Sequence, residues 1–177
     1  MNRMMLRTAL ATAALILLAG CNSADDAATD LLARAFHPDD ECHVCGMAVT
    51  GFPGPKGQAV GRDGTRVFCS TAELIGWWLQ PENHVAGAKL FVHDMAHGSW
   101  EHPDDEQLID ATTAWYVAGT ELKGAMGATL ASFASEADAR ALATEHDGRV
   151  LRFDELDASV LQRGGDHMPQ GRHMPAY

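Results

Sequence analysis

Residues 68–73, Phe68-Cys69-Ser70-Thr71-Ala72-Glu73, carry the clearest signal of the fold. Ser70 stands where a helix N-cap is expected, and Glu73 follows three residues later, as in a capping box. The residues after it predict a helix that ends before Pro81. Residues 133–138 repeat the pattern without a gap, as Phe133-Ala134-Ser135-Glu136-Ala137-Asp138. The chain therefore contains two strand-to-helix junctions of the same kind.

Short strand patterns surround both junctions. The predicted strands of the first half are 58–61, 65–68 and 89–94, and Arg62-Asp63-Gly64 predicts a hairpin between the first two. The predicted strands of the second half are 113–117, 129–133 and 149–153. The second helix should end near His146, with Gly148 as its C′ residue. We expect an α+β fold of two related ββαβ units, residues 41–100 and 108–160, although ordinary junctions can also resemble each other by chance.

Residues 1–20 predict a lipoprotein signal peptide. Basic residues open the segment, residues 9–18 are apolar, and Leu18-Ala19-Gly20-Cys21 resembles the bacterial lipobox. The apolar run is shorter than the roughly 20 residues that a membrane-spanning helix needs. We therefore expect acyl chains on Cys21 to anchor the protein to the lipid membrane, on its periplasmic side. An Asp directly after the lipidated Cys would favour retention in the inner membrane. This chain has Asn22 there, which favours the outer membrane.

Residues 21–40 are small and polar and predict a flexible tether, so the folded part should begin near Glu41. The whole chain has a net charge of −11 and no basic cluster. A surface of this kind argues against nucleic acid as a partner.

Residues 161–177 predict a disordered tail. His167-Met168-Pro169 recurs as His173-Met174-Pro175, and neither copy has helical or strand periodicity. Imidazole and thioether groups side by side suit copper. The tail is therefore either inert or a secondary copper site formed by His167, Met168, His173 and Met174.

The residues with the clearest chemistry are Glu41-Cys42-His43-Val44-Cys45-Gly46-Met47. A thiolate and a thioether are soft ligands that select Cu(I) over harder divalent ions. In an oxidising compartment, Cys42 and Cys45 could instead pair as a disulfide. A zinc site would need about four ligands, and no second pair of ligands completes one. We expect Cys69 to pack as a small buried hydrophobe.

Several further stretches, in this order, make the chain resemble the NosL family of nitrous oxide reductase accessory lipoproteins. They are Cys45-Gly46-Met47, Gly54-Pro55-Lys56-Gly57-Gln58, Phe68-Cys69-Ser70-Thr71, Phe91-Val92-His93-Asp94-Met95, Trp100, Asp110-Ala111, Gly124-Ala125-Met126-Gly127 and Phe133-Ala134-Ser135. The resemblance covers residues 41 to about 156. It implies two ββαβ units with a fold similar to that of organomercurial lyase.

The same resemblance implies a function. NosL proteins are periplasm-facing Cu(I) chaperones that supply the copper–sulfur centre of nitrous oxide reductase. The implied partners are that enzyme and the periplasmic component of its ABC-type maturation complex. The family's Cu(I) ligands, a Cys and a Met, fall on Cys45 and Met47. Family members often have a His before the Gly-Pro-Lys stretch, and Phe52 stands near that place here.

The sequence leaves the third copper ligand open. Met126 ranks first because it lies in a Gly-flanked turn shared with the family, and Cys42 and His43 follow. Met95 and His97, which come after a predicted strand, are further possible ligands. For a lone Met or His, however, packing in the core or exposure to solvent is more common than metal binding. A two-ligand site open to a partner's side chain is equally consistent with the sequence.

Two enzymatic functions compete with the carrier function. A thiol–disulfide oxidoreductase could use Cys42 and Cys45, but it would want a thioredoxin-like βαβ context. An organomercurial lyase-like enzyme could use the thiols with an acid. The motifs of hydrolases, zinc proteases and phosphate-binding loops do not occur in the sequence. We therefore expect a metal carrier and not an enzyme.

Overall fold

The computed structural model describes residues 31–84 and 87–163. They belong to one compact unit and form several antiparallel sheets with few helices. The predicted mixture of helices and antiparallel strands is therefore confirmed. None of the helices within these residues has the length and apolar composition needed to cross a membrane.

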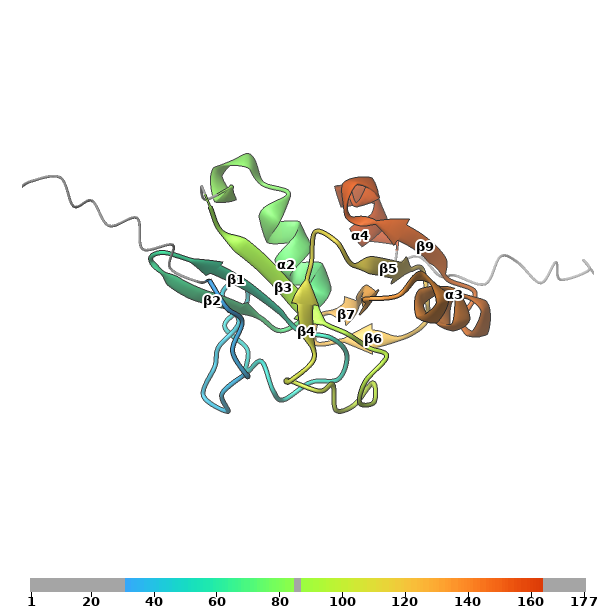
Figure 1. Cartoon of the computed structure of the whole chain (residues 1–177), viewed down its shortest axis with the longest axis horizontal. Coiled ribbons are helices and arrows are strands. Elements are labelled where there is room, and N and C mark those ends of the chain that lie inside the picture. The colour runs from blue at the N-terminus through green and yellow to red at the C-terminus, as the bar shows by residue number, and fades with distance from the viewer. Residues whose placement is uncertain (1–30, 85–86, 164–177) are drawn as a thin grey trace, which may run out of the picture. The chain divides into compact units, whose positions relative to one another are not determined.

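The first half contains the predicted hairpin. Strands β1 (Gly57–Gly61) and β2 (Gly64–Phe68) pair antiparallel, with Gly61 opposite Gly64. Strand β3 (Lys89–His93) pairs with the other side of β1, and β4 (Leu108–Asp110) completes a sheet of order β2-β1-β3-β4 (Figure 1). Sequence patterns predicted the first three strands and missed β4, which is only three residues long.

Helix α2 (Thr71–Trp78) begins as predicted. The Ser70 hydroxyl accepts hydrogen bonds from the backbone N–H groups of Ala72 and Glu73, which stabilises the first turn. The Glu73 carboxylate accepts a hydrogen bond from that hydroxyl. In a full capping box it would instead accept one from the backbone N–H of Ser70. The helix buries Leu74 against β1, where Gly57 leaves room for it: a Cβ at Gly57 would lie 2.6 Å from a Leu74 methyl.

The second half has the same chain order. Strands β5 (Trp115–Ala118) and β8 (Ala131–Phe133) precede helix α3 (Glu136–Glu145), and β9 (Arg149–Arg152) follows it. The sheet order is β8-β5-β9, all antiparallel. In both halves the first strand is central, and the strands before and after the helix flank it. A hairpin of β6 (Lys123–Gly124) and β7 (Gly127–Ala128) and a last helix α4 (Ala158–Arg163) were not predicted.

The end of α3 differs from the prediction. Asp147, not Gly148, takes the left-handed conformation, with a φ of 52°. The Gly148 N–H donates to the Ala143 carbonyl, as the C″ residue does in a Schellman motif. Gly148 has a different use, because a Cβ there would lie 2.6 Å from a Val117 methyl. The glycine therefore allows the chain to pass close to β5.

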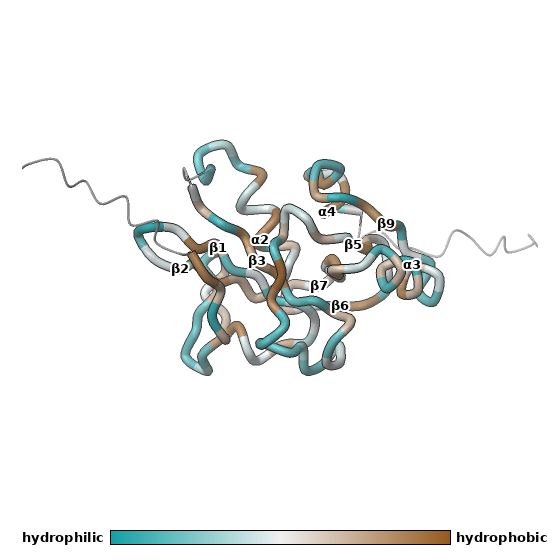
Figure 2. Tube along the Cα trace, in the orientation of Figure 1, coloured by the Kyte–Doolittle hydropathy of each residue, from teal (hydrophilic) through white to brown (hydrophobic). Residues whose placement is uncertain are grey.

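The two halves share one core. Tyr116 and Leu151 of the second half belong to the same buried cluster as Phe68 and Leu74 of the first. At the boundary, the Ser132 hydroxyl donates to the His93 carbonyl at 2.7 Å. Figure 2 shows apolar residues concentrated along strands and polar residues on many of the loops, as expected for a core between the sheets and helices.

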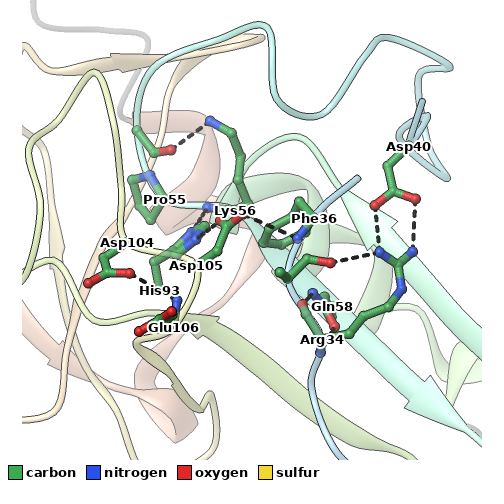
Figure 3. A network of polar contacts seen from close by, with 12 residues as sticks. Arg34, Phe36, Asp40, Pro55, Lys56, Gln58, His93, Asp104, Asp105 and Glu106 are labelled. Atoms are coloured by element: carbon green, nitrogen blue, oxygen red, sulfur yellow. Dashed lines mark hydrogen bonds and ion pairs between the residues drawn. The ribbon is translucent and has the colours of Figure 1, made fainter. Parts of the chain in front are cut away.

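The predicted tether is wrong for residues 31–40. Leu31 and Phe36 are buried, and the Arg34 guanidinium forms an ion pair with Asp40 at 2.7 Å (Figure 3). The Phe36 N–H also donates to the Asp105 carboxylate. Polar composition suggested a tether, but two buried apolar side chains, together with these polar contacts, dock the segment. Residues 21–30 lie outside the described part of the chain.

Candidate metal centre

The loop of residues 41–48 positions the thiols. Glu41 and Ala48 form an antiparallel bridge, and inside it the Cys42 N–H donates to the Met47 carbonyl at 2.8 Å. Gly46 has a φ of 71°, a conformation that favours glycine, and its N–H donates back to the Cys42 carbonyl. The loop is therefore a closed turn with Cys42 and Cys45 on it.

A backbone contact fixes this loop to the first sheet. The His43 N–H donates to the carbonyl of Val67 in β2 at 2.8 Å. Cys69 comes two residues after Val67, at the junction between β2 and α2. The contact therefore brings the thiol loop to the junction that also carries the third cysteine.

The three thiols form a cluster. The sulfur atoms of Cys42, Cys45 and Cys69 all lie within 4.8 Å of one another, and those of Cys45 and Cys69 are 3.5 Å apart. All three are free cysteines. Cys42 and Cys69 are buried, whereas Cys45 is half-buried. The sequence assigned Cys69 only to packing, yet its sulfur is a member of the cluster. A metal could be reached from solvent on the Cys45 side.

The surroundings of the buried sulfurs differ. Burial raises the pKa of Cys42, but backbone N–H groups of Cys69, Cys45 and Val44 directed at its sulfur outweigh it, so the pKa is below its ordinary value. Burial raises the pKa of Cys69, and the neighbouring sulfurs and the Glu73 carboxylate raise it further. Without a metal, the negative charge of the cluster is therefore better stabilised on Cys42 than on Cys69.

Met47 and His43 lie on either side of Cys45 in the loop. Met47 is half-buried and packs against the main core cluster. The exposed His43 ring makes edge contacts with Phe68 and Trp77, with centroids 5.9 and 5.7 Å away. Among the described residues, the three cysteines form a group of mutually close possible ligands, and His43 does not belong to it.

Met126 lies elsewhere, in the two-residue turn of the β6–β7 hairpin. Its side chain is 59% exposed. It shares a groove of about 560 Å³ with His43. Glu73, whose carboxylate is 3.9 Å from the Cys69 sulfur, also lines this groove. The groove thus runs beside the cluster. Its lining residues are His43, Val44, Ala72, Glu73, Gly76, Trp77, Gln80, Asn83, Met126, Ala128 and Leu161.

Comparison with known proteins assigns the family. Residues 33–161 match the model of the NosL family. The chain belongs to the NosL family. The resemblance seen in the sequence is therefore confirmed over most of the chain.

Two curated NosL relatives and one solved NosL structure support this assignment. The copper-binding lipoprotein NosL of Stutzerimonas stutzeri is 60% identical over 164 residues, which cover 88% of this chain and 86% of the relative. The protein of the same name from Achromobacter cycloclastes is 33% identical over 165 residues, 90% of this chain and 84% of the relative. The crystal structure of the copper chaperone NosL from Shewanella denitrificans superposes with a TM-score of 0.69 at 39% identity, covering 73% of this chain and 98% of that one.

These NosL names describe metal-binding proteins and a chaperone, and none of them describes an enzyme. The prediction that the chain is not an enzyme is therefore confirmed.

Other residues in the NosL stretches have structural roles. The buried His93 ring accepts a hydrogen bond from the Lys56 N–H on Nδ1, and its Nε2 lies 2.9 Å from Asp105 Oδ1 (Figure 3). Both ring nitrogens are occupied, so His93 has no free atom for a metal. Met95 packs against the second core cluster, and His97 is exposed beside Asp94.

Lys56 fixes the loop in front of it. Its buried ammonium donates to the carbonyls of Phe52, Pro53 and Gly54 at 2.6 to 3.0 Å. Burial lowers the pKa of Lys56 to about 8, although the nearby Cys69 and Asp105 act in the opposite direction and raise it. The backbone carbonyl of Phe52, near the place where the family resemblance led us to expect a histidine, is thus one of the hydrogen-bond acceptors of Lys56.

The remaining predicted site residues lie outside the described part of the chain. They are the lipidation residue Cys21 and the tail residues His167, Met168, His173 and Met174.

Proposed function

We propose that this protein is a lipid-anchored Cu(I) chaperone that faces the periplasm and delivers copper for the copper–sulfur centre of nitrous oxide reductase. The observation that carries the proposal is the cluster of three free thiols with Cys45 at its accessible side, in a chain of the NosL family. Clustered sulfur ligands select Cu(I), the soft ion. Copper is the cargo in this scheme, so the site must release it as well as hold it.

In this proposal Cys45 is the central ligand. Met47 supplies a thioether that adds no charge, and Cys42 is the preferred third ligand because its sulfur already lies within 4.8 Å of that of Cys45. Met126 and His43 line the groove beside the cluster and would bind during entry or release. Because Cys45 is only half-buried, a ligand from a partner could approach the copper from solvent.

Membrane attachment and partners complete the proposal. The signal peptide of residues 1–20 would direct the chain to the periplasm, and acylated Cys21 would hold it on the outer rather than the inner membrane. The recipients would be nitrous oxide reductase and the periplasmic component of its ABC-type maturation complex. The names of the two curated relatives as lipoproteins support the anchor.

We also propose that the two halves are related ββαβ units of the organomercurial lyase type. The support is their common strand order, with a central first strand, and their serine-capped helices.

An anaerobic Cu(I) titration of the reduced protein against a competing chelator tests the function. We expect one tight site whose affinity falls most in Cys45→Ser and less in Met47→Leu, because the thiolate supplies charge and the thioether does not. Unchanged affinity in Cys45→Ser would overturn the proposal. A thiol–disulfide oxidoreductase would instead need both Cys42 and Cys45 and would be indifferent to Met47.

A further inference from the structure

We propose that Cys45 is a site of reversible oxidation, and that Cys69 is the resolving cysteine that closes a disulfide with it. The inference deepens the proposed function and rests on it only for its consequence, because Cys45 is the central copper ligand of that proposal. Formation of the disulfide itself can be measured without copper.

The two sulfur atoms already lie close together. The Sγ atoms of Cys45 and Cys69 are 3.5 Å apart. A disulfide bond is about 2.05 Å long, so the two atoms must approach by about 1.5 Å. The loop that carries Cys45 has room to move, since Val44 is 54% exposed and a Cβ at Gly46 would meet no atom within 4 Å. A small shift of this loop towards the junction of β2 and α2 would therefore close the bond.

Burial assigns a different role to each thiol. Cys45 is half-buried, whereas Cys42 and Cys69 are buried. Cysteines that react with oxidants are accessible to solvent and often lie beside a second, resolving cysteine. An oxidant can therefore attack at Cys45, and Cys69 can reach the modified sulfur from inside the protein. A bond between Cys42 and Cys69 has no accessible sulfur at which to begin.

Cys42 is less suited to resolve the modified Cys45, although the two share the C-x-x-C spacing. Backbone N–H groups of Cys69, Cys45 and Val44 are directed at the Cys42 sulfur. Movement of this sulfur into a bond with Cys45 would leave buried donors without their acceptor, which costs free energy. The Cys69 sulfur instead contacts the Cys45 sulfur and, at 3.9 Å, the Glu73 carboxylate.

The reaction balances with a disulfide as the oxidant. The Cys45 thiolate attacks one sulfur of the oxidant, whose S–S bond breaks and releases one thiolate. Cys69 then attacks the Cys45 sulfur, and its proton passes to the Glu73 carboxylate, which lines the solvent-accessible groove. The second half of the oxidant leaves as a thiolate. Overall, the two cysteines lose two electrons and two protons, and the oxidant becomes two thiols.

This modification would control copper loading. A closed disulfide removes the Cys45 thiolate that a copper ion needs. In an oxidising compartment, where disulfides form and persist, the carrier would accept copper only after a dithiol had reduced it. Reduction by a dithiol is therefore the class of reaction that must precede loading. Bound copper, in turn, occupies Cys45 and blocks the first attack.

The first experiment maps the disulfide. The full chain in detergent, reduced and free of metal, is incubated anaerobically with oxidised glutathione, quenched with acid, alkylated with N-ethylmaleimide and analysed by mass spectrometry. We expect a bond between Cys45 and Cys69, with Cys42 alkylated. The internal disulfide should exceed the mixed disulfide with glutathione at least about tenfold while free glutathione stays near 0.1 mM, because the effective concentration of a tethered thiol is millimolar or higher.

Several outcomes of this map would overturn the proposal. They are a disulfide that contains Cys42, a disulfide between two chains, a mixed disulfide that persists on Cys45, and three alkylated cysteines. The map needs no variant, so it decides even where a substitution prevents folding.

A pair of variants tests the resolving role. Cys69→Ala should stop the reaction at the mixed disulfide on Cys45, because the second attack has no nucleophile. Cys42→Ser changes another buried thiol of the same cluster and should still form the disulfide between Cys45 and Cys69. Circular dichroism checks that both variants fold. Equal yields of internal disulfide in Cys69→Ala and the unmodified sequence would contradict the assignment.

Copper binding gives the functional readout. The oxidised protein should lose its tight Cu(I) binding in competition with a chelator, and should regain it after reduction with a phosphine that is then removed. Undiminished Cu(I) affinity of the oxidised protein would overturn the control of loading. Failure of the proposed function would look different, because the reduced protein would then bind no Cu(I) tightly, while the disulfide would still form.

Discussion

At the scale of single residues, the cluster combines two cysteines of a local motif with one from a distant junction. The motif itself shows Cys42, Cys45 and Met47 as candidates, because their types and spacing suit a soft metal. Nothing in the local pattern shows that Cys69 joins them. Its position follows from the hydrogen bond between the His43 N–H and the Val67 carbonyl, a tertiary contact without a sequence signature. The signal available was its place inside a stretch shared with the NosL family.

Lys56 leads to a prediction about pH. Its pKa is about 8 in the folded protein, below its ordinary value of 10.5, so the unfolded chain binds more protons between these pH values. As the pH rises through that window, this residue should therefore increase the free energy of unfolding by up to about 1.4 kcal/mol per pH unit. Urea unfolding of the reduced protein at several pH values measures the gain.

The Lys56→Met variant is the control. The comparison must be the difference between the two proteins, so that contributions common to both cancel. That difference should change with pH from about 8 to 10.5 and stay constant below pH 7. Parallel stability curves across the whole range would contradict the prediction.

At the scale of secondary structure elements, short-range chemistry accounts for what was predictable. The Arg62-Asp63-Gly64 turn defines the β1–β2 hairpin, and Ser70 and Ser135 define the starts of α2 and α3. The missed strands β4, β6 and β7 have two or three residues each, too few for an alternating pattern. Strand β4 pairs with β3 across a long loop, a partner that only the assembled fold selects, whereas β6 and β7 pair with each other across a two-residue turn.

The contact between β1 and α2 gives a prediction about packing. Gly57→Ala places a methyl group 2.6 Å from a Leu74 methyl and 2.8 Å from its Cβ, so the helix must move. Overpacking of this kind typically destabilises by about 1–3 kcal/mol. Gly51→Ala is the matched control, since its Cβ would meet Ala48 at an ordinary 3.9 Å. Chemical denaturation gives the free energy of unfolding of both variants. Equal values would show that β1 and α2 can move apart to accommodate the methyl group at little cost.

At the scale of the whole molecule, the folded unit begins earlier than composition suggested. A chain that starts at Leu31 should be as stable as the mature protein. A chain that starts at Glu41 loses buried Phe36 and the Arg34–Asp40 ion pair. Loss of a buried Phe side chain alone typically costs about 3–5 kcal/mol. Thermal unfolding of the two truncated chains measures the difference. Equal midpoints would show that residues 31–40 contribute nothing to stability and act as part of the tether.

The anchor leads to a prediction about location. Cys21→Ala should release the chain into the periplasm without reducing its stability, because the folded unit contains residues from Leu31 onward. Cell fractionation followed by circular dichroism tests both parts. A Cys21→Ala protein that still fractionates with membranes would indicate a retained signal segment.

The hydrogen bond between His43 and Val67, which brings Cys45 close to Cys69, also affects how much a bound metal stabilises the fold. The two cysteines are 24 positions apart, so an ion bound to both sulfurs closes a ring of chain in the way a disulfide does. Ligands that bind only the native state raise its stability by mass action, by about 4 kcal/mol at a thousand times the dissociation constant. The loaded carrier is then harder to unfold and to digest than the empty one. Proteolysis would preferentially remove carriers that have no cargo, so the lifetime of the protein would itself record copper supply.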